Sequence, residues 1–205
     1  MAPVTTALSP SVAALQSRFG DAIVRAEVSC GDSIVYLAAA QSHDILAWLK
    51  DDPAQRYDYL IDVTAVEYRD RERDLEVVYQ LWSMEHKRFL RIKIALPKAG
   101  PLEVASVVDL WAGADWLERE VWDMFGIRFA GHPDLRRILM WENYAEGHPL
   151  RKDFPLRGRF SRSEQTRRAL SGELEKHYSM EELSITDAAP YLPADMKTRR
   201  AEGPG

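Results

Sequence analysis

The sequence predicts an α+β protein, a two-layer sandwich whose mixed or antiparallel sheet is followed by helices and an extended C-terminal arm. Two observations support this fold class. Apolar residues recur at helical spacing in some segments and alternate with period two in others, and the connections between the alternating segments are short. The elements follow in the order αββαβββ, which is typical of a two-layer sandwich.

The first elements are a helix, a hairpin and a second helix. Apolar residues at helical spacing predict a helix over residues 8–19, and Gly20 is a stop signal. Residues 22–37 predict a β-hairpin that turns at residues 30–33. A short amphipathic helix then begins at Ser42, a favourable N-cap residue, and ends at an Asp-Pro pair.

Three segments with period-two alternation follow, at residues 57–63, 75–81 and 90–96. Their charged connections are short enough for hairpins, so we expect an antiparallel meander. After Pro101 the pattern becomes helical again, and we expect a short helical segment around residues 104–110.

The strongest helix pattern begins at Asp115. Asp115 and Glu118 have the spacing of a capping box, and Gly126 is well placed to end the helix. Trp122 lies off the apolar stripe, so we expect it to be an interface anchor. The stripe itself consists of Leu117, Val121, Met124 and Phe125.

The last third of the chain has the composition of an arm. Residues 136–168 contain nine basic and four acidic residues, a local charge of +5, so the remainder of the chain sums to -10. Its prolines oppose a local core although it carries several aromatic residues. We therefore expect an α+β core domain at 1–135 and an extended basic arm at 136–205 that lies on a partner. A polar helical patch is expected near residues 173–183.

Composition excludes several functions. The formal charge is -5, and no uncharged stretch is long enough for a membrane-spanning helix. The N-terminus lacks the pattern of a secretory signal, so we expect an intracellular protein. Cys30 is the one cysteine, which excludes an internal disulfide and an iron–sulfur cluster held within this chain.

Four residues could form a metal-dependent active site: Glu120 and Asp123, one helical turn apart, with His132 and His148. Neither histidine stands in a spaced ligand motif. We favour the interpretation that the charged helix face is solvated or ion-paired, with Arg119 and Asp123 as an i, i+4 pair.

Two binding functions have partial support in the sequence. The tripeptide at residues 132–134, His-Pro-Asp, marks J-domain co-chaperones, but there it joins two long helices of an all-α module. The basic arm could bind RNA through arginines and aromatic rings. The overall acidity favours protein docking instead, since arginine is enriched at protein interfaces.

Three stretches carry a family resemblance: residues 118–127, 131–139 and 147–156, which read EREVWDMFGI, GHPDLRRIL and GHPLRKDFPL. They resemble the 30 kDa subunit family, the C subunit of NADH-quinone oxidoreductase or respiratory complex I. The family signature is a Glu-Arg-Glu triplet, an acid followed by two apolar residues, then a histidine, an arginine and an apolar pair. All of these elements are present, and the resemblance covers most of the chain.

The resemblance implies a non-catalytic core subunit of the peripheral arm of a proton-translocating enzyme. Such a subunit holds no cofactor, since flavin and iron–sulfur clusters belong to partner subunits. It would pack against the D and B subunits of complex I, which frame the quinone site, on the cytoplasmic side of the bacterial inner membrane, the mitochondrial matrix side being the other location considered. Related membrane-bound hydrogenases and plastid-type complexes contain homologous subunits and stay open as alternatives.

The resemblance also carries over a set of signature and interface residues. We expect the charged residues of the helix to fix the loop that bears His132 and Asp134, and the basic residues beyond it to dock on acidic partner surface. The full set is Glu118, Arg119, Glu120, Trp122, Asp123, Met124, Phe125, Gly126, Gly131, His132, Pro133, Asp134, Arg136, Arg137, Ile138, Leu139, Gly147, His148, Pro149, Arg151, Lys152, Asp153 and Phe154.

Overall fold

The computed structural model describes residues 8–68, 75–97, 100–156 and 158–170. The chain divides into two compact units, residues 1–161 and 162–205, and each is considered by itself. The expected boundary at 135/136 therefore lies inside the first unit.

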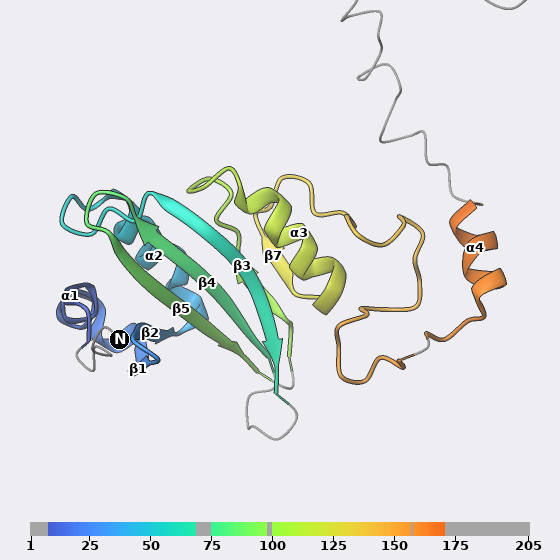
Figure 1. Ribbon diagram of the computed structural model, residues 1–205, viewed down its shortest axis with the longest axis horizontal. Coiled ribbons are helices and arrows are strands. Elements are labelled where there is room, and N and C mark those ends of the chain that lie inside the picture. The colour runs from blue at the N-terminus through green and yellow to red at the C-terminus, as the bar shows by residue number, and fades with distance from the viewer. Residues whose placement is uncertain (1–7, 69–74, 98–99, 157, 171–205) are drawn as a thin grey trace, which may run out of the picture. The chain divides into compact units, whose positions relative to one another are not determined.

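The first unit contains a five-stranded mixed sheet (Figure 1), which confirms the α+β fold class. Strands β1 (Ile23–Ser29) and β2 (Asp32–Leu37) form the expected hairpin. Strands β3 (Tyr59–Glu67), β4 (Leu75–Ser83) and β5 (Arg88–Leu96) form the expected antiparallel meander. The spatial order is β1-β2-β5-β4-β3, and β2 runs parallel to β5.

One face of this sheet forms the hydrophobic core. Val35, Ile92, Tyr79 and Val63 are neighbours in register on β2, β5, β4 and β3, so they share this face. All four are buried. Helices α1 (Pro10–Phe19) and α2 (Ser42–Asp51) contribute buried apolar side chains to the same cluster. Two short 3-10 turns, η1 (Gly20–Ala22) and η2 (Ala39–Gln41), precede β1 and α2.

The opposite face of the sheet carries polar and charged side chains. Tyr36, Lys93, Val78 and Thr64 form the next row across β2, β5, β4 and β3. Lys93 Nζ lies 3.1 Å from a carboxylate oxygen of Glu76, in an ion pair between neighbouring strands. We refer to this side of the sheet as the open face; Tyr36, Val78 and Glu76 on it are buried, whereas Arg91 and Asp32 are partly exposed.

A small second sheet corrects one expectation. Residues 103–105 form strand β6 (Glu103–Ala105), which pairs in parallel with β7 (Arg128–Ala130), so the helical segment expected around residues 104–110 is wrong. Turns follow β6 instead. Helix α3 (Ala114–Phe125) joins the two strands and lies beside the edge strand β3 (Figure 1). The strand is too short to show an alternation that sequence periodicity could detect.

The segment after β7 is irregular. The described residues from 131 to 161 form turns and bends without a helix or strand. In the second unit, helix α4 (Arg162–Leu170) was not expected, although Glu164 pairs with Arg167 and Arg168 at the spacing that supports a helix. The polar helical patch expected near residues 173–183 lies outside the described residues.

Candidate functional site

The signature residues gather around helix α3, and Glu118, the first acid of the signature, does not cap this helix. Gly113 is the N-cap residue and makes no side-chain capping bond, so the expected capping box is wrong. Glu118 is fully buried instead. Its carboxylate accepts hydrogen bonds from the Ser106 hydroxyl and the Val107 N–H, both at 2.7 Å. Glu118 therefore holds the chain just after β6 against α3.

Burial also changes the acidity of Glu118. It raises the pKa of the carboxyl to about 7, against the lowering effect of the hydrogen bonds from Val107 and Ser106. Burial likewise raises the pKa of the Tyr79 hydroxyl in the core, and the nearby negative charge of Glu118 raises it further. The Glu118 carboxyl is therefore a buried group that changes protonation near neutral pH.

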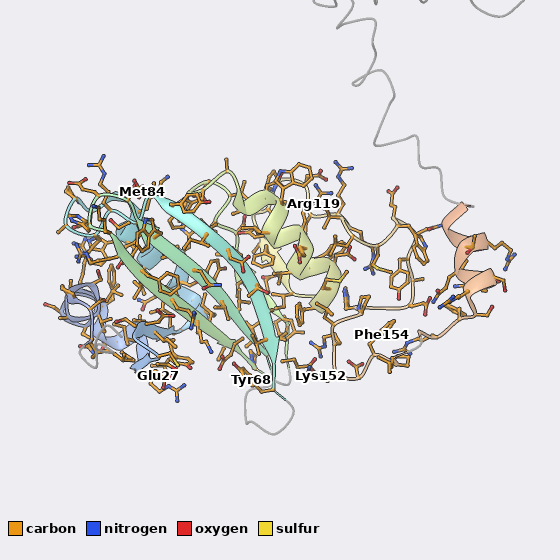
Figure 2. All side chains as sticks on the ribbon, in the orientation of Figure 1. Glu27, Tyr68, Met84, Arg119, Lys152 and Phe154 are labelled. Atoms are coloured by element: carbon orange, nitrogen blue, oxygen red, sulfur yellow. The ribbon has the colours of Figure 1, made fainter. Side chains whose placement is uncertain are left out.

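Arg119 binds the main chain of the segment that follows β7. Only 2% of this residue is exposed, and its guanidinium donates to the carbonyl oxygens of Arg136 and Arg137 at 3.2 and 3.1 Å. The expected i, i+4 pair with Asp123 is replaced by these bonds. The guanidinium carbon lies 5.2 Å from the centre of the Trp116 ring, which is 58% exposed (Figure 2 labels Arg119).

Asp123 is the centre of the site. It is fully buried, and its Oδ2 accepts the backbone N–H groups of three successive residues at 2.8 to 3.1 Å. These residues are Ile138, Leu139 and Met140. Its Oδ1 forms a close ion pair with Arg137. A single carboxylate thus binds three peptide groups and one guanidinium, and this explains why an acid stands at this position of the motif.

Arg137 points into the molecule. Its side chain is 11% exposed and donates to the carbonyl oxygen of Gly147 as well as to Asp123. Its guanidinium carbon lies 5.5 Å from the Trp122 ring centre and 5.2 Å from that of Tyr144. The expectation that Arg137 docks on a partner surface is therefore wrong, because its charge is already used internally.

Trp122 is also an internal contact. It is half-buried and packs edge-on against the ring of His148, with ring centres 6.4 Å apart. The exposed tryptophan of α3 is Trp116. The expectation that Trp122 anchors an interface stays a prediction, and Trp116 is the more exposed of the two side chains.

Gly126 ends α3 as expected, in a left-handed conformation at φ 77°. The structure adds a second reason for glycine. A Cβ atom there would lie 2.6 Å from the His148 ring, a distance that real contacts do not reach. His148 Nδ1 donates to the carbonyl oxygen of Asp123 at 3.0 Å, since a carbonyl can only accept. The helix end and the Gly-His-Pro segment therefore fit directly together.

His132 closes the other end of the site. Its side chain is fully buried, Nδ1 accepts the Asp134 N–H at 3.0 Å, and Nε2 donates to the Asp115 carbonyl oxygen at 3.2 Å. Asp134 pairs with Arg136 at 2.6 Å. The His-Pro-Asp tripeptide therefore forms a turn after β7 that is pinned to the start of α3, which differs from the helix–helix loop of a J-domain.

Arg151 and Lys152, the second pair of adjacent basic residues in the signature, contact the end of strand β3. Glu67 at the end of β3 accepts the Lys152 N–H at 2.6 Å and lies 3.9 Å from Arg151 Nε (Figure 2 labels Lys152). Arg151 also lies 3.7 Å from Asp153. Sequence reasoning missed Glu67 and Ser106 as binding partners, because a polar residue at a strand end gives no local signal of what folds back onto it.

The other signature residues have mixed surroundings. Met124 is buried, Phe125 is half-buried, and Leu139 is 60% exposed. Glu120 is exposed. Half-buried or exposed positions in the turns after β7 are held by Gly131, Pro133, Gly147, Pro149 and Phe154.

The four candidate metal ligands do not form one site. Glu120 is exposed, Asp123 binds Arg137 and peptide groups, and His132 and His148 bind different carbonyl groups. Across residues 8–68, 75–97, 100–156 and 158–170, no three His, Cys, Asp or Glu side chains gather as a metal site would require. The same residues include no helix with the length and apolar character needed to cross a membrane.

Comparisons with known proteins identify a family and several relatives of the chain. The family model described as respiratory-chain NADH dehydrogenase, 30 Kd subunit, matches residues 35–160. The NADH-quinone oxidoreductase C 2 subunit of Rhizobium etli is 44% identical over 146 residues, which is 71% of this chain and 76% of the relative. The C subunit of the same enzyme from Acidothermus cellulolyticus is 41% identical over 152 residues, covering 74% and 78%.

Solved structures agree on the fold. A trypsin-resistant fragment of Nqo5 superposes with a TM-score of 0.53 at 28% identity, covering 61% of this chain and 98% of the fragment. A chain of an archaeal membrane-bound sulfane sulfur reductase gives 0.59 at 23% identity, covering 71% and 84%, which shows the shared fold alone. The chain belongs to the family of the 30 Kd subunit of respiratory-chain NADH dehydrogenase.

Proposed function

We propose that this chain is a structural subunit of an NADH-quinone oxidoreductase and carries no redox step itself. Its relatives are named as subunits of that enzyme. The observation that carries the structural role is the use of the signature charges. The side chains of Glu118, Arg119 and Asp123 all bind peptide groups, and Asp123 also binds Arg137. The contacts of these signature residues therefore favour support of a loop over binding of a substrate.

The loop held by α3 is the proposed contact with partner subunits. Leu139 is 60% exposed on this loop, and Trp116 is 58% exposed beside Arg119, which binds the same loop. Exposed tryptophan and leucine side chains over a rigid support are typical of interface anchors. The proposed partners are the D and B subunits around the quinone site, on the cytoplasmic side of the bacterial inner membrane. Flavin and iron–sulfur clusters would reside in partner subunits.

Affinity purification from the native membranes tests this function. The tagged full chain should copurify with flavin- and cluster-bearing subunits and with NADH-quinone reductase activity. A different catalytic subunit, such as that of a hydrogenase, would overturn the assignment of the electron donor. Recovery of the chain without any partner would overturn the subunit role.

A double variant tests whether this loop contacts partner subunits. Trp116→Ser combined with Leu139→Ser should lower copurification of the partner subunits at least about tenfold, while the far-UV circular dichroism of the purified chain stays unchanged. Met84→Ser is the matched control, since Met84 is 61% exposed in the turn just after β4, well away from α3 (Figure 2). Full assembly of the double variant would exclude this loop as the contact. The pair Arg136 and Arg137 is unsuitable here, because reversing Arg137 would also break the ion pair with Asp123.

A further inference from the structure

A cavity opens where the end of α3 meets the irregular segments at residues 147–156 and 158–159. It has a volume of about 280 Å³ and is lined on its apolar side by Phe125 and Phe154. Its charged lining consists of Arg151, Arg159 and Asp153. Figure 2 labels Phe154 in the first of these segments. These three side chains carry one positive charge in excess, and His148 also lines the cavity.

The guanidinium groups of Arg151 and Arg159 both have N–H donors that bind no acceptor in the described part of the chain. Arg151 has carboxylates at 3.7 and 3.9 Å, beyond hydrogen-bond distance, and its side chain is 28% exposed. The Arg159 guanidinium lies 5.9 Å from the centre of the Phe154 ring. Within the part of the chain that the structure describes, neither guanidinium donates a hydrogen bond, and Arg159 has no ion pair. Each group offers five N–H donors in a fork that matches a carboxylate.

The surrounding charge selects an anion. Most of the cavity lining comes from residues 147–159, which contain four basic residues and one acid, a local charge of +3 in the sequence. The walls from Phe125 and Phe154 are suited to methylene groups. An acidic side chain combines both features, because it has a carboxylate at the end of an apolar stem.

We propose that this cavity receives a glutamate or aspartate side chain of a partner subunit, with its carboxylate between Arg151 and Arg159. This inference rests on the proposed function, and it assigns a role to Arg159, which lies outside the family signature residues. A protein carboxylate fits better than a free anion, since the phenyl walls would contribute nothing to binding a small hydrated ion. Arg159 provides the sharper test, because its side chain has no ion pair in the described chain to lose.

The test uses the full chain in its complex. The single variant Arg159→Gln and a double variant, Arg151→Gln together with Arg159→Gln, are compared with wild type. The readout is copurification of partner subunits at about 50 and about 300 mM salt. Arg159→Lys keeps the charge without the fork. Arg56→Gln is the matched control, since Arg56 is an exposed arginine paired with Glu85 elsewhere on the molecule.

The double variant should lose at least about tenfold of its partner recovery at 300 mM salt, with unchanged circular dichroism, because removing one side of a buried charge pair leaves the other unpaired. Arg159→Lys should fall between wild type and Arg159→Gln.

Two results would overturn the inference. If wild type and both glutamine variants assemble equally, the cavity is not occupied by a partner. If inorganic phosphate raises the melting temperature of wild type but not of Arg159→Gln while assembly is unchanged, the occupant is a free anion. Failure of the wild-type chain to copurify with any partner would instead contradict the proposed function, so the two failures are distinguishable.

Discussion

The charged residues of α3 and those of the open face have different kinds of partner. On α3, Asp123 and Arg119 bind peptide N–H and C=O groups of a distant segment. On the open face, Lys93 binds Glu76, and Arg91 lies 3.1 Å from Asp32, so side chain pairs with side chain across neighbouring strands. The charges of α3 therefore fix the path of the main chain after β7. The charge pairs on the open face join strands that backbone hydrogen bonds already hold together.

The largest effect is expected from Asp123→Ala. It leaves three buried N–H groups and the Arg137 guanidinium without their acceptor, and removal of one partner of a buried ion pair costs about 3–5 kcal/mol. Urea denaturation should show this loss, and hydrogen exchange should accelerate at the three amides. Asp134→Ala is the control, because the Asp134 side chain is 57% exposed and should cost about 0–1 kcal/mol. Equal losses for both variants would contradict the role of Asp123.

Gly126→Ala should be the next most destabilising. An alanine in the left-handed conformation costs roughly 1–2 kcal/mol, and its Cβ would also displace the His148 ring. Gly113→Ala at the other end of α3 is matched, since its φ is -65° and its Cβ would meet no atom within 4 Å. Thermal unfolding should separate the two variants. A neutral result at Gly126 would mean that the His148 contact is loose.

The buried Glu118 makes stability depend on pH. Its folded pKa of about 7 lies above the ordinary 4.5, so protonation favours the folded state. This stabilisation is complete below about pH 4.5 and is lost as pH rises through 7, with about 1 kcal/mol disappearing between pH 6 and 8. Glu118→Gln should flatten this part of the profile measured by urea denaturation, while Glu120→Gln, at an exposed site, should keep it. A slope unchanged by Glu118→Gln would assign the titration to another group.

Sequence patterns predicted the local parts of this fold. The hairpin, the meander and the end of α3 at Gly126 follow from alternation and from turn residues that lie close together in the chain. The parallel pairing of β2 with β5 does not, because the two strands are far apart in sequence. Family resemblance located the signature residues without showing what each one binds.

The charges of α3 fix the following loop as expected, but their individual partners could not be predicted, for a related reason. A helix with an apolar stripe and charges beside it normally turns its charges to solvent. Here the coil after β7 folds back and supplies peptide partners, so Glu118, Arg119 and Asp123 become buried. Arg137 turned inward for the same reason, since its partner Asp123 lies 14 residues earlier in the chain. Periodicity over a few residues carries no information about such a contact.

The smallest effect is expected on the open face. The Arg91 and Asp32 side chains are 28% and 40% exposed, so a double-mutant cycle with alanine should give a coupling of about 0.2–1 kcal/mol. Raising the salt concentration should reduce this coupling further, because solvent ions screen exposed charges. The same cycle on Asp123 and Arg137 should give a larger coupling with little salt dependence, since both side chains are almost completely buried. If both pairs couple equally, burial and peptide partners do not distinguish the Asp123–Arg137 pair from the Arg91–Asp32 pair, and the support for a structural signature is lost.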